Sequence, residues 1–252
     1  MRKYVSIKST DEKIVEVILN RVDKANALNK DMLVELNEFF REIMDERYIV
    51  IIRGEGNKYF SAGADIESLY NGELNVVEIH KYFDIIEEYP HPVIAMVNGY
   101  CFGAACELIA ACDLRTASSK SLFGITPAKL GLTYSIEGIE RVIKLIGYSK
   151  AKLLFLTGKT ITSEEALRYG LVDYVYDPDI LEEETIRIAR ELAENAPLSM
   201  ESIKRVFNLI RYQKAYDETT LTDVYNLALE SRDYREGLKA FLEKRKPLYR
   251  GR

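Results

Sequence analysis

The spacing of apolar residues in the first half of the chain alternates between two periods. The runs KIVEVIL (13–19), YIVIIR (48–53) and VIAMV (93–97) are rich in β-branched residues, which favour strands. Between them, residues 31–46 and 76–88 repeat apolar side chains at helical spacing. Strands that alternate with helices in this way predict an α/β core.

The second half of the chain has a mainly helical pattern. Thr162 and Glu165 are spaced as a capping box, which predicts the start of a helix, and Gly170 is placed to end that helix. The run LVDYVY (171–176) is typical of a short strand. Helical spacing then continues over residues 178–247. The pattern therefore predicts that helices predominate after the α/β core.

We expect two parts, an α/β core over residues 1–195 and a helical region over residues 196–252. With 47% apolar residues among 252, the chain can bury a sizeable core. Its formal net charge of −5 argues against a general nucleic-acid binder. Residues 235–252 differ from the rest, with seven Lys or Arg against two Glu. Such a basic tail is either a solvated face or a contact for a phosphate-bearing ligand.

The cysteines and histidines predict neither a disulfide framework nor a metal site. Cys101, Cys106 and Cys112 are odd in number and form no C-x-x-C pair, and His80 and His91 are the only histidines. We expect reduced thiols that pack as small apolar residues, no metal, and a cytoplasmic location. The chain shows no cleavable leader and no apolar run of about 20 residues, so no membrane span is expected.

The segment GAACE (103–107) places small residues directly before an apolar helical pattern. The first N–H groups of a helix lack partners within the helix, and the helix dipole makes that end partly positive. The N–H of Ala104 can therefore donate to an oxygen that becomes negative during a reaction, and Glu107 shares its helix face. Tight helix packing, with Glu107 in an ion pair or at the surface, explains the same spacing.

A second turn of small residues, SAGAD, occupies residues 61–65. Asp65 can cap a short helix there while the N–H of Ala64 points outward. Alone, this turn predicts only a capped loop. Together, the two turns offer the two separate backbone donors that a carbonyl oxygen needs when it becomes an enolate.

Several segments resemble the enoyl-CoA hydratase (crotonase) superfamily. From NRVDKANALN (20–29) onward they follow the family order along nearly the whole chain: FSAGADI, PVIAMVNGYCFGAACELIAACDL, FGITPAKLGL, GLVDYV and REGLKAFLEKRKP. The resemblance implies a core of stacked ββα units and a C-terminal helical region that packs homotrimers, commonly paired into hexamers. It also implies an acyl-CoA thioester substrate, so that coenzyme A enters as part of the substrate and no other cofactor is expected.

The resemblance also implies roles for particular residues. The backbone N–H groups of Ala64 and of Ala104, which follows Gly103, would form an oxyanion hole for an enolate. Phe241 and Lys244 match tail residues that can reach the coenzyme A of a neighbouring subunit, where Lys244 would meet a phosphate. The residues that match the segment lining coenzyme A are Lys24, Ala25, Ala27, Leu28, Ala62, Asp65 and Ile66.

The hydratases of this family use two glutamates, of which the sequence retains one. Glu107 matches the first, whereas FGITPAKLGL places Pro127 at the second position, and proline has no ionisable group. Hydration requires water to be deprotonated while a proton reaches the α-carbon, a task that suits two carboxylates. Pro127 therefore argues against ordinary hydration and weakens the double-bond isomerase interpretation.

The stretch TPAKLGLTY (126–134) resembles the methylmalonyl-CoA decarboxylase branch, where T-P-x-x-L-G-x-x-Y occurs. The resemblance implies that Tyr134 lies beside the reacting carboxylate of the substrate. That branch has His at the position of Ala64, in SAGHD rather than SAGAD, so the match is incomplete. An ordinary buried tyrosine with a bonded hydroxyl is the alternative for Tyr134.

The sequence supports three functional hypotheses. The first is an acyl-CoA lyase of this superfamily that acts through an enolate, with the exact reaction open. The second is a methylmalonyl-CoA decarboxylase-like enzyme that uses Tyr134. The third, of another class, is a non-catalytic member that binds acyl-CoA or RNA, although no basic, aromatic-interleaved surface is evident outside the tail. Glu107 is either a proton donor with a raised pKa or a structural carboxylate, and Asp113 is expected to be structural.

Overall fold

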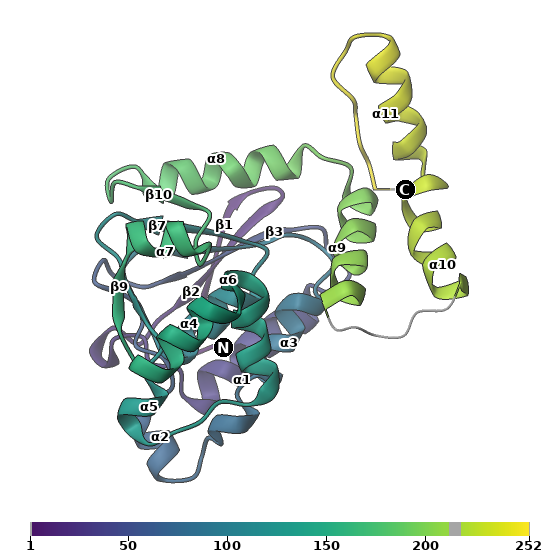
Figure 1. Cartoon of the computed structure of the whole chain (residues 1–252). Helices are drawn as coiled ribbons and strands as arrows, with labels where there is room; N and C mark the ends of the chain where they lie inside the picture. The colour runs from purple at the N-terminus through teal and green to yellow at the C-terminus, as the bar shows by residue number, and fades with distance from the viewer. Residues whose placement is uncertain (1, 212–217, 252) are drawn as a thin grey trace.

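The computed structural model describes residues 2–211 and 218–251 as two sheets with helices around them (Figure 1). The strands are β1 (Val5–Asp11), β2 (Ile14–Leu19), β3 (Ile49–Gly54), β4 (Tyr59–Ser61), β5 (Val93–Val97), β6 (Tyr100–Phe102), β7 (Leu114–Ser118), β8 (Leu122–Gly124), β9 (Thr160–Thr162) and β10 (Tyr174–Tyr176). The helices are α1 (Lys30–Glu42), α2 (Ile66–Tyr70), α3 (Lys81–Glu88), α4 (Ala104–Ala111), α5 (Pro127–Leu130), α6 (Ile136–Thr157), α7 (Ser163–Tyr169), α8 (Leu181–Ala193), α9 (Pro197–Arg211), α10 (Glu218–Leu229) and α11 (Arg232–Leu242). Short 3₁₀ turns cover Val22–Lys24 and Val76–Glu78.

The larger sheet has the strand order β1-β2-β3-β5-β7-β10. β1 and β2 form an antiparallel hairpin, and every other neighbouring pair is parallel. On one face, Ile14, Ile49 and Ile94 belong to the cluster that also contains apolar residues of α8. On the other face, Val50 and Ala95 belong to the cluster with apolar residues of α1, α3 and α4. Because helices cover both faces, the parallel strands are continuous apolar runs.

The smaller sheet has the order β4-β6-β8-β9. It confirms the ββα units that the resemblance implies, in β3-β4-α2, β5-β6-α4 and β7-β8-α5. In each unit the first strand joins the large sheet, the second joins the small sheet, and a helix follows. β4, β6 and β8 are parallel, so their carboxyl ends meet at one edge. The turns that lead into α2, α4 and α5 therefore lie together.

Local signals in the second half of the core are confirmed. The side chain of Thr162 accepts a hydrogen bond from the Glu165 backbone N–H, and the Glu165 side chain accepts from the Thr162 N–H, which completes the capping box. Gly170 ends α7 in the left-handed conformation. The strand predicted over 171–176 is shorter, because only residues 174–176 pair with β7.

The helices of the first half also differ in length from the prediction. The helix expected over 31–46 ends at Glu42, and the one expected over 76–88 is divided into a 3₁₀ turn and α3. The sequence did not predict β4, β6 and β8. Each is three residues long, which is too short to show a two-residue period, and tertiary pairing alone makes them strands.

The last three helices project from one side of the sheets (Figure 1). Lys204 of α9 joins them to the core, since its Nζ lies 2.7 Å from Oδ2 of Asp113 and donates to the carbonyl oxygen of His91 at 3.1 Å. Asp113 also accepts from the backbone N–H of Val93, which gives it the structural role expected. The division near residue 195 stays a prediction. None of the helices described here is both long and apolar enough to cross a bilayer.

We expect Phe83→Ala to destabilise the fold strongly. Phe83 of α3 is fully buried in the core cluster that also contains residues of α4. Truncating a buried phenylalanine removes its transfer free energy and leaves a cavity, so the free energy of unfolding should fall by about 3–5 kcal/mol. Urea denaturation measures this change. Tyr70→Ala is the control, because Tyr70 is 91% exposed and its loss should change stability by less than about 0.5 kcal/mol.

Candidate active site

Two glycine turns at the edge of the small sheet lie against each other. Gly63 and Gly103 both have positive φ, 90° and 55° respectively. A β-carbon added at Gly63 would lie 2.5 Å from the carbonyl oxygen of Phe102 and 3.0 Å from the backbone nitrogen of Ala104. Such distances leave no room for a side chain at position 63. The close approach brings together the two turns that the sequence singled out, although they are about 40 residues apart.

The amides of Ala64 and Ala104 are not used by the fold. Leu28 donates its N–H to the carbonyl oxygen of Gly63 and accepts from the N–H of Asp65, so the N–H of Ala64 between them points elsewhere. Ala104 is the first residue of α4, where an N–H has no partner within the helix. Among the described residues, neither amide has a hydrogen-bond acceptor. Both can therefore donate to a bound oxygen.

A small cavity of about 60 Å³ opens at these turns. The predicted site residues that line it are Ala62, Ala64, Ile66, Gly103, Ala104, Glu107 and Tyr134. Pro127 lines it as well, from the first position of α5. Of the described residues around this cavity, Glu107 is the only carboxylate. The other walls are mainly apolar.

Glu107 is almost fully buried on α4, at 3% exposure. Its Oε1 accepts a hydrogen bond of 2.7 Å from Nη1 of Arg141 on α6. Burial raises the pKa of Glu107 to about 7, against the opposing effect of the Arg141 charge. A β-carbon at Gly138 would lie 2.8 Å from Oε2 of Glu107, so this glycine makes room for the carboxyl group. The ion pair expected as one alternative is present, and it is buried.

Tyr134 faces the cavity from the loop before α6. Its ring packs edge-on against Phe155, with the ring centroids 5.1 Å apart. A β-carbon on Gly103 would lie 3.7 Å from the Tyr134 hydroxyl oxygen, which places that hydroxyl beside the Ala104 turn. Burial raises the pKa of Tyr134 well above its ordinary value, so the hydroxyl stays protonated. Within the described part of the chain, the hydroxyl has no hydrogen-bond partner.

The segment before α1 lies beside the first turn rather than in the cavity. The carbonyl oxygen of Ala25 accepts from the N–H of Ala62, and Leu28 pairs with Ala64. Asp65 caps α2, as predicted, by accepting from the N–H of Ser68. The structure thus places the predicted residues Lys24, Ala25, Ala27, Leu28 and Asp65 around the turn.

The predicted tail residues lie elsewhere in the chain. Phe241 is near the end of α11 and is 84% exposed, and Lys244 follows that helix. Figure 1 shows α11 on the opposite side of the molecule from α2 and α5, whose residues line the cavity. Within one chain the tail does not meet this site, and its contact with a neighbouring subunit stays a prediction.

Arg141 and its acidic partners are functional candidates that the sequence analysis missed. Arg141 donates to Glu87 and Asp84 of α3 as well as to Glu107. A signal was present, since Arg141 falls three residues after the buried Gly138 on the apolar face of α6. Glu87 likewise falls four residues after Phe83, on the buried face of α3. Charged residues at core positions of two helices indicate that they pair.

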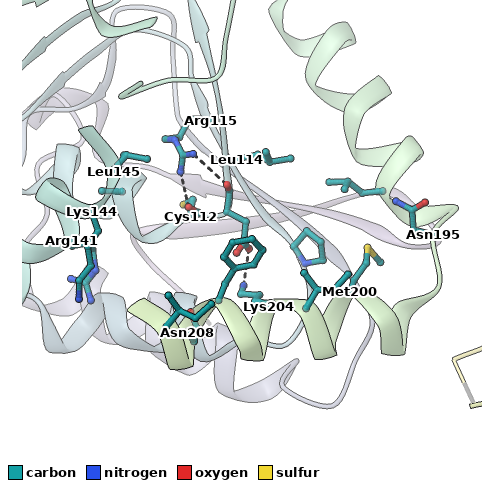
Figure 2. Close-up of a pocket in the computed structure, with 17 residues that line it drawn as sticks. Cys112, Leu114, Arg115, Arg141, Lys144, Leu145, Asn195, Met200, Lys204 and Asn208 are labelled. Carbon is teal, nitrogen blue, oxygen red and sulfur yellow. Dashed lines mark hydrogen bonds and ion pairs between the residues drawn. The ribbon is translucent and has the colours of Figure 1, made fainter. Parts of the chain in front are cut away.

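A larger cavity, of about 870 Å³, lies between α9 and the core (Figure 2). Met200, Lys204 and Asn208 of α9 face the corner between α4 and β7, where Cys112 and Arg115 lie. None of the predicted site residues lines this cavity. Arg141 connects the two cavities, since it lines the larger one and bonds Glu107, which lines the smaller one.

We expect Gly63→Ala to separate the two turns. The new methyl group would meet backbone atoms of Phe102 and Ala104 that belong to another strand and helix. Gly72→Ala is the matched control, because Gly72 also has positive φ, 73°, but has open space where the β-carbon would lie. Both variants carry conformational strain of about 1 kcal/mol. Urea denaturation should show a loss at least about 2 kcal/mol larger for Gly63→Ala, and equal losses would contradict the close approach.

The buried carboxyl group should make stability depend on pH. Because the pKa of Glu107 is raised in the folded state, the stability linked to this group is lost as pH rises from about 4.5 to about 7. Glu107→Gln has no such titration. The parent should therefore lose about 2 kcal/mol of stability between pH 5 and pH 8 that Glu107→Gln does not lose. The free energy of unfolding of Glu107→Gln minus that of the parent should be larger at pH 8 by this amount. A difference that is the same at both pH values would show that Glu107 titrates normally.

The chain is similar to known proteins over nearly its whole length. The family described as enoyl-CoA hydratase/isomerase matches residues 9–252. The chain is 35% identical to the short-chain-enoyl-CoA hydratase of Clostridium acetobutylicum over 93% of each protein. It is 32% identical to the methylmalonyl-CoA decarboxylase of Escherichia coli, over 99% of this chain and 98% of that one.

Solved structures give the same assignment. The crystal structure of an enoyl-CoA hydratase from Bacillus anthracis superposes with a TM-score of 0.89 at 34% identity, covering 99% of this chain and all of the other. The two sheets with their ββα units and the extent of these matches support the same family. The chain therefore belongs to the enoyl-CoA hydratase/isomerase (crotonase) superfamily.

Proposed function

We propose that the protein is a CoA-thioester lyase that decarboxylates a short 2-carboxyacyl-CoA such as methylmalonyl-CoA. The observation that carries this proposal is the composition of the cavity. Tyr134 and Pro127 share it with Glu107, so it combines a protonated hydroxyl with a single carboxyl group. The relative named methylmalonyl-CoA decarboxylase supports the proposal, because its similarity extends over almost the whole chain.

The thioester oxygen would bind between the amides of Ala64 and Ala104. Both N–H groups lack acceptors in the described fold and border one cavity. Two such donors stabilise the negative charge that develops on a carbonyl oxygen, and losing one donor typically costs about 10²–10³ in rate. The positive end of α4 adds to the effect at Ala104.

Decarboxylation would then need little further machinery. The bond between the α-carbon and the carboxylate breaks, carbon dioxide leaves, and the electron pair passes to the α-carbon and the thioester oxygen as an enolate. The α-carbon next takes one proton, which yields the shortened acyl-CoA. Tyr134 and Glu107 are the two groups of the cavity that can hold such a proton.

The size and walls of the cavity favour a short acyl group. Its volume of about 60 Å³ is bounded by the apolar side chains of Leu69, Val76, Ile79, Leu130 and Leu132. A long acyl chain would require these side chains to move apart. We therefore assign the cavity to an acyl group of a few carbon atoms.

Coenzyme A would lie outside the cavity, along the segment before α1. Lys24, Ala25 and Ala27 flank the first turn there. The exposed Phe241 and the basic tail near Lys244 would complete the site of a neighbouring subunit in a homotrimer or a dimer of trimers. The substrate itself supplies coenzyme A in this proposal.

Hydration of an enoyl-CoA is the second candidate. Relatives named short-chain-enoyl-CoA hydratase and crotonyl-CoA hydratase are 35% and 36% identical to this chain. The retained Glu107 favours this reaction, since it corresponds to one of the two glutamates of the hydratases. Pro127 opposes it, because it leaves no second carboxyl group to share the proton transfers.

We expect the purified protein to convert methylmalonyl-CoA to propionyl-CoA and to leave crotonyl-CoA and a 3-enoyl-CoA unchanged. Liquid chromatography of the CoA esters measures all three reactions. Tyr134→Phe should lower kcat for decarboxylation by about 10²-fold or more, because the variant loses a hydroxyl group that can bond the substrate's carboxylate or hold the proton that the α-carbon takes.

The control is Tyr148→Phe, a change of the same kind at a tyrosine that is 63% exposed, and it should leave kcat unaltered. Rapid hydration of crotonyl-CoA would overturn the inference from Pro127. If the protein binds these thioesters but converts none of them, the result would favour a non-catalytic member of the family.

A further inference from the structure

Arg141 holds three acidic side chains from two other helices. Its Nε donates to Oε1 of Glu87 at 2.8 Å, and its Nη2 donates to Oε2 of Glu87 at 3.0 Å and to Oδ1 of Asp84 at 2.7 Å. Its Nη1 donates to Oε1 of Glu107 at 2.7 Å. All three nitrogens of the guanidinium group are thus engaged. One cation links α3, α4 and α6 directly behind the cavity.

Acidic side chains outnumber the guanidinium group at this point of the described fold. Three carboxyl groups surround Arg141, and both Glu107 and Glu87 are at most 3% exposed. Like charges that are buried together repel one another, which favours the protonated form of a buried acid. Asp84 lies nearer the surface, with its side chain 40% exposed.

The hydrogen bonds distinguish the two buried acids. Glu87 receives two bonds from the guanidinium fork, the geometry that best stabilises a carboxylate. Glu107 receives one bond, on Oε1, and its Oε2 has no partner among the described residues. Oε2 also lies close to Gly138, since a β-carbon built there would be 2.8 Å away. A proton on Oε2 of Glu107 therefore displaces no existing hydrogen bond.

We propose that Arg141 is a positioning residue that fixes Oε1 of Glu107 and leaves a proton on its Oε2, available to the substrate's α-carbon. This inference rests on the proposed function, which supplies the enolate that would accept the proton. Asp84 and Glu87 act with Arg141, because their negative charges favour the protonated form of Glu107. The cluster is thus a device for keeping one buried carboxyl group neutral.

The surrounding groups are consistent with this assignment. Burial, together with the charges of Glu87 and Asp84, raises the pKa of Glu107 to about 7, and Arg141 alone opposes the shift by charge and hydrogen bond. Tyr134, which also faces the cavity, remains neutral and adds no charge. The arrangement places the titration of Glu107 within the pH range of ordinary assays.

When the enolate forms, its α-carbon takes the proton from Oε2 of Glu107, and the electron pair of the O–H bond stays on the carboxylate. The new negative charge then lies next to Arg141, whose positive charge offsets it. A proton from solvent restores Glu107 before the next turnover. Activity should therefore require the protonated form and fall as pH rises through the pKa of Glu107.

The test measures the alkaline limb of kcat for decarboxylation in three variants. Arg141→Gln removes the positive charge that bonds Glu107, so the limb should move to higher pH by about one unit or more, with a lower kcat. Asp84→Asn removes one of the opposing negative charges, so the limb should move to lower pH. Arg141→Lys keeps the positive charge, and its limb should return toward that of the parent. A purely structural role would lower activity without these opposite shifts.

A second readout does not depend on turnover. Carbon-13 NMR of protein labelled at the glutamate carboxyl carbon follows the titration directly, with the Glu107 resonance assigned by its loss in Glu107→Gln. We expect this resonance to titrate near pH 7 and to move in the same directions as the kinetic limb. Glu140→Gln is the matched control, since Glu140 is next to Arg141 in sequence, but its side chain is 52% exposed and its carboxylate pairs with Lys144.

The outcomes separate the two proposals. If Arg141→Gln does not fold, Asp84→Asn still tests the prediction, because it changes a half-exposed side chain. Titration of Glu107 near its ordinary pKa, or limbs that fail to move in Asp84→Asn, would overturn the role of the cluster. The titration of Glu107 could instead move in opposite directions in Arg141→Gln and Asp84→Asn while the protein converts no thioester. That result would support the electrostatic coupling and refute the proposed function.

Discussion

The contact between two main-chain turns is the constraint on which the site depends. Gly63 lies so close to Phe102 and Ala104 that a side chain of any size would push β4 away from β6. The parallel pairing of these strands brings the turns to one edge of the small sheet. Because the contact is between backbones, two amides without acceptors in the described fold border one cavity, while their neighbours take part in hydrogen bonds of the fold.

Behind the turns, a buried charge cluster bonds the carboxyl group that lines the cavity. Arg141 joins α3, α4 and α6 through carboxylates rather than through apolar packing alone. Breaking such a buried network leaves uncompensated charges, which makes its members depend on one another. Gly138 has a steric role in it, since only glycine leaves space for the carboxyl group of Glu107.

The opposite wall differs from the one that the resemblance implies for hydratases. Pro127 begins α5 where the resemblance places a second glutamate in hydratases, and Tyr134 lies beyond it with a neutral hydroxyl. A site with one carboxyl group suits a reaction in which the departure of carbon dioxide creates the enolate. In such a reaction the enzyme has to stabilise one oxygen and deliver one proton, and two amides and one acid suffice.

Local signals in the sequence determined the α/β class, the strands β2, β3 and β5, the helix caps at Thr162 and Asp65, and the two small-residue turns. These features depend on periodicity and on hydrogen bonds between near neighbours, which a sequence displays. Only the tertiary structure decided that β4, β6 and β8 are strands, and that Arg141 meets Glu107. Three-residue strands carry no period, and a charged residue on an apolar helix face does not reveal its partner, because both are defined by segments that meet only when the chain folds.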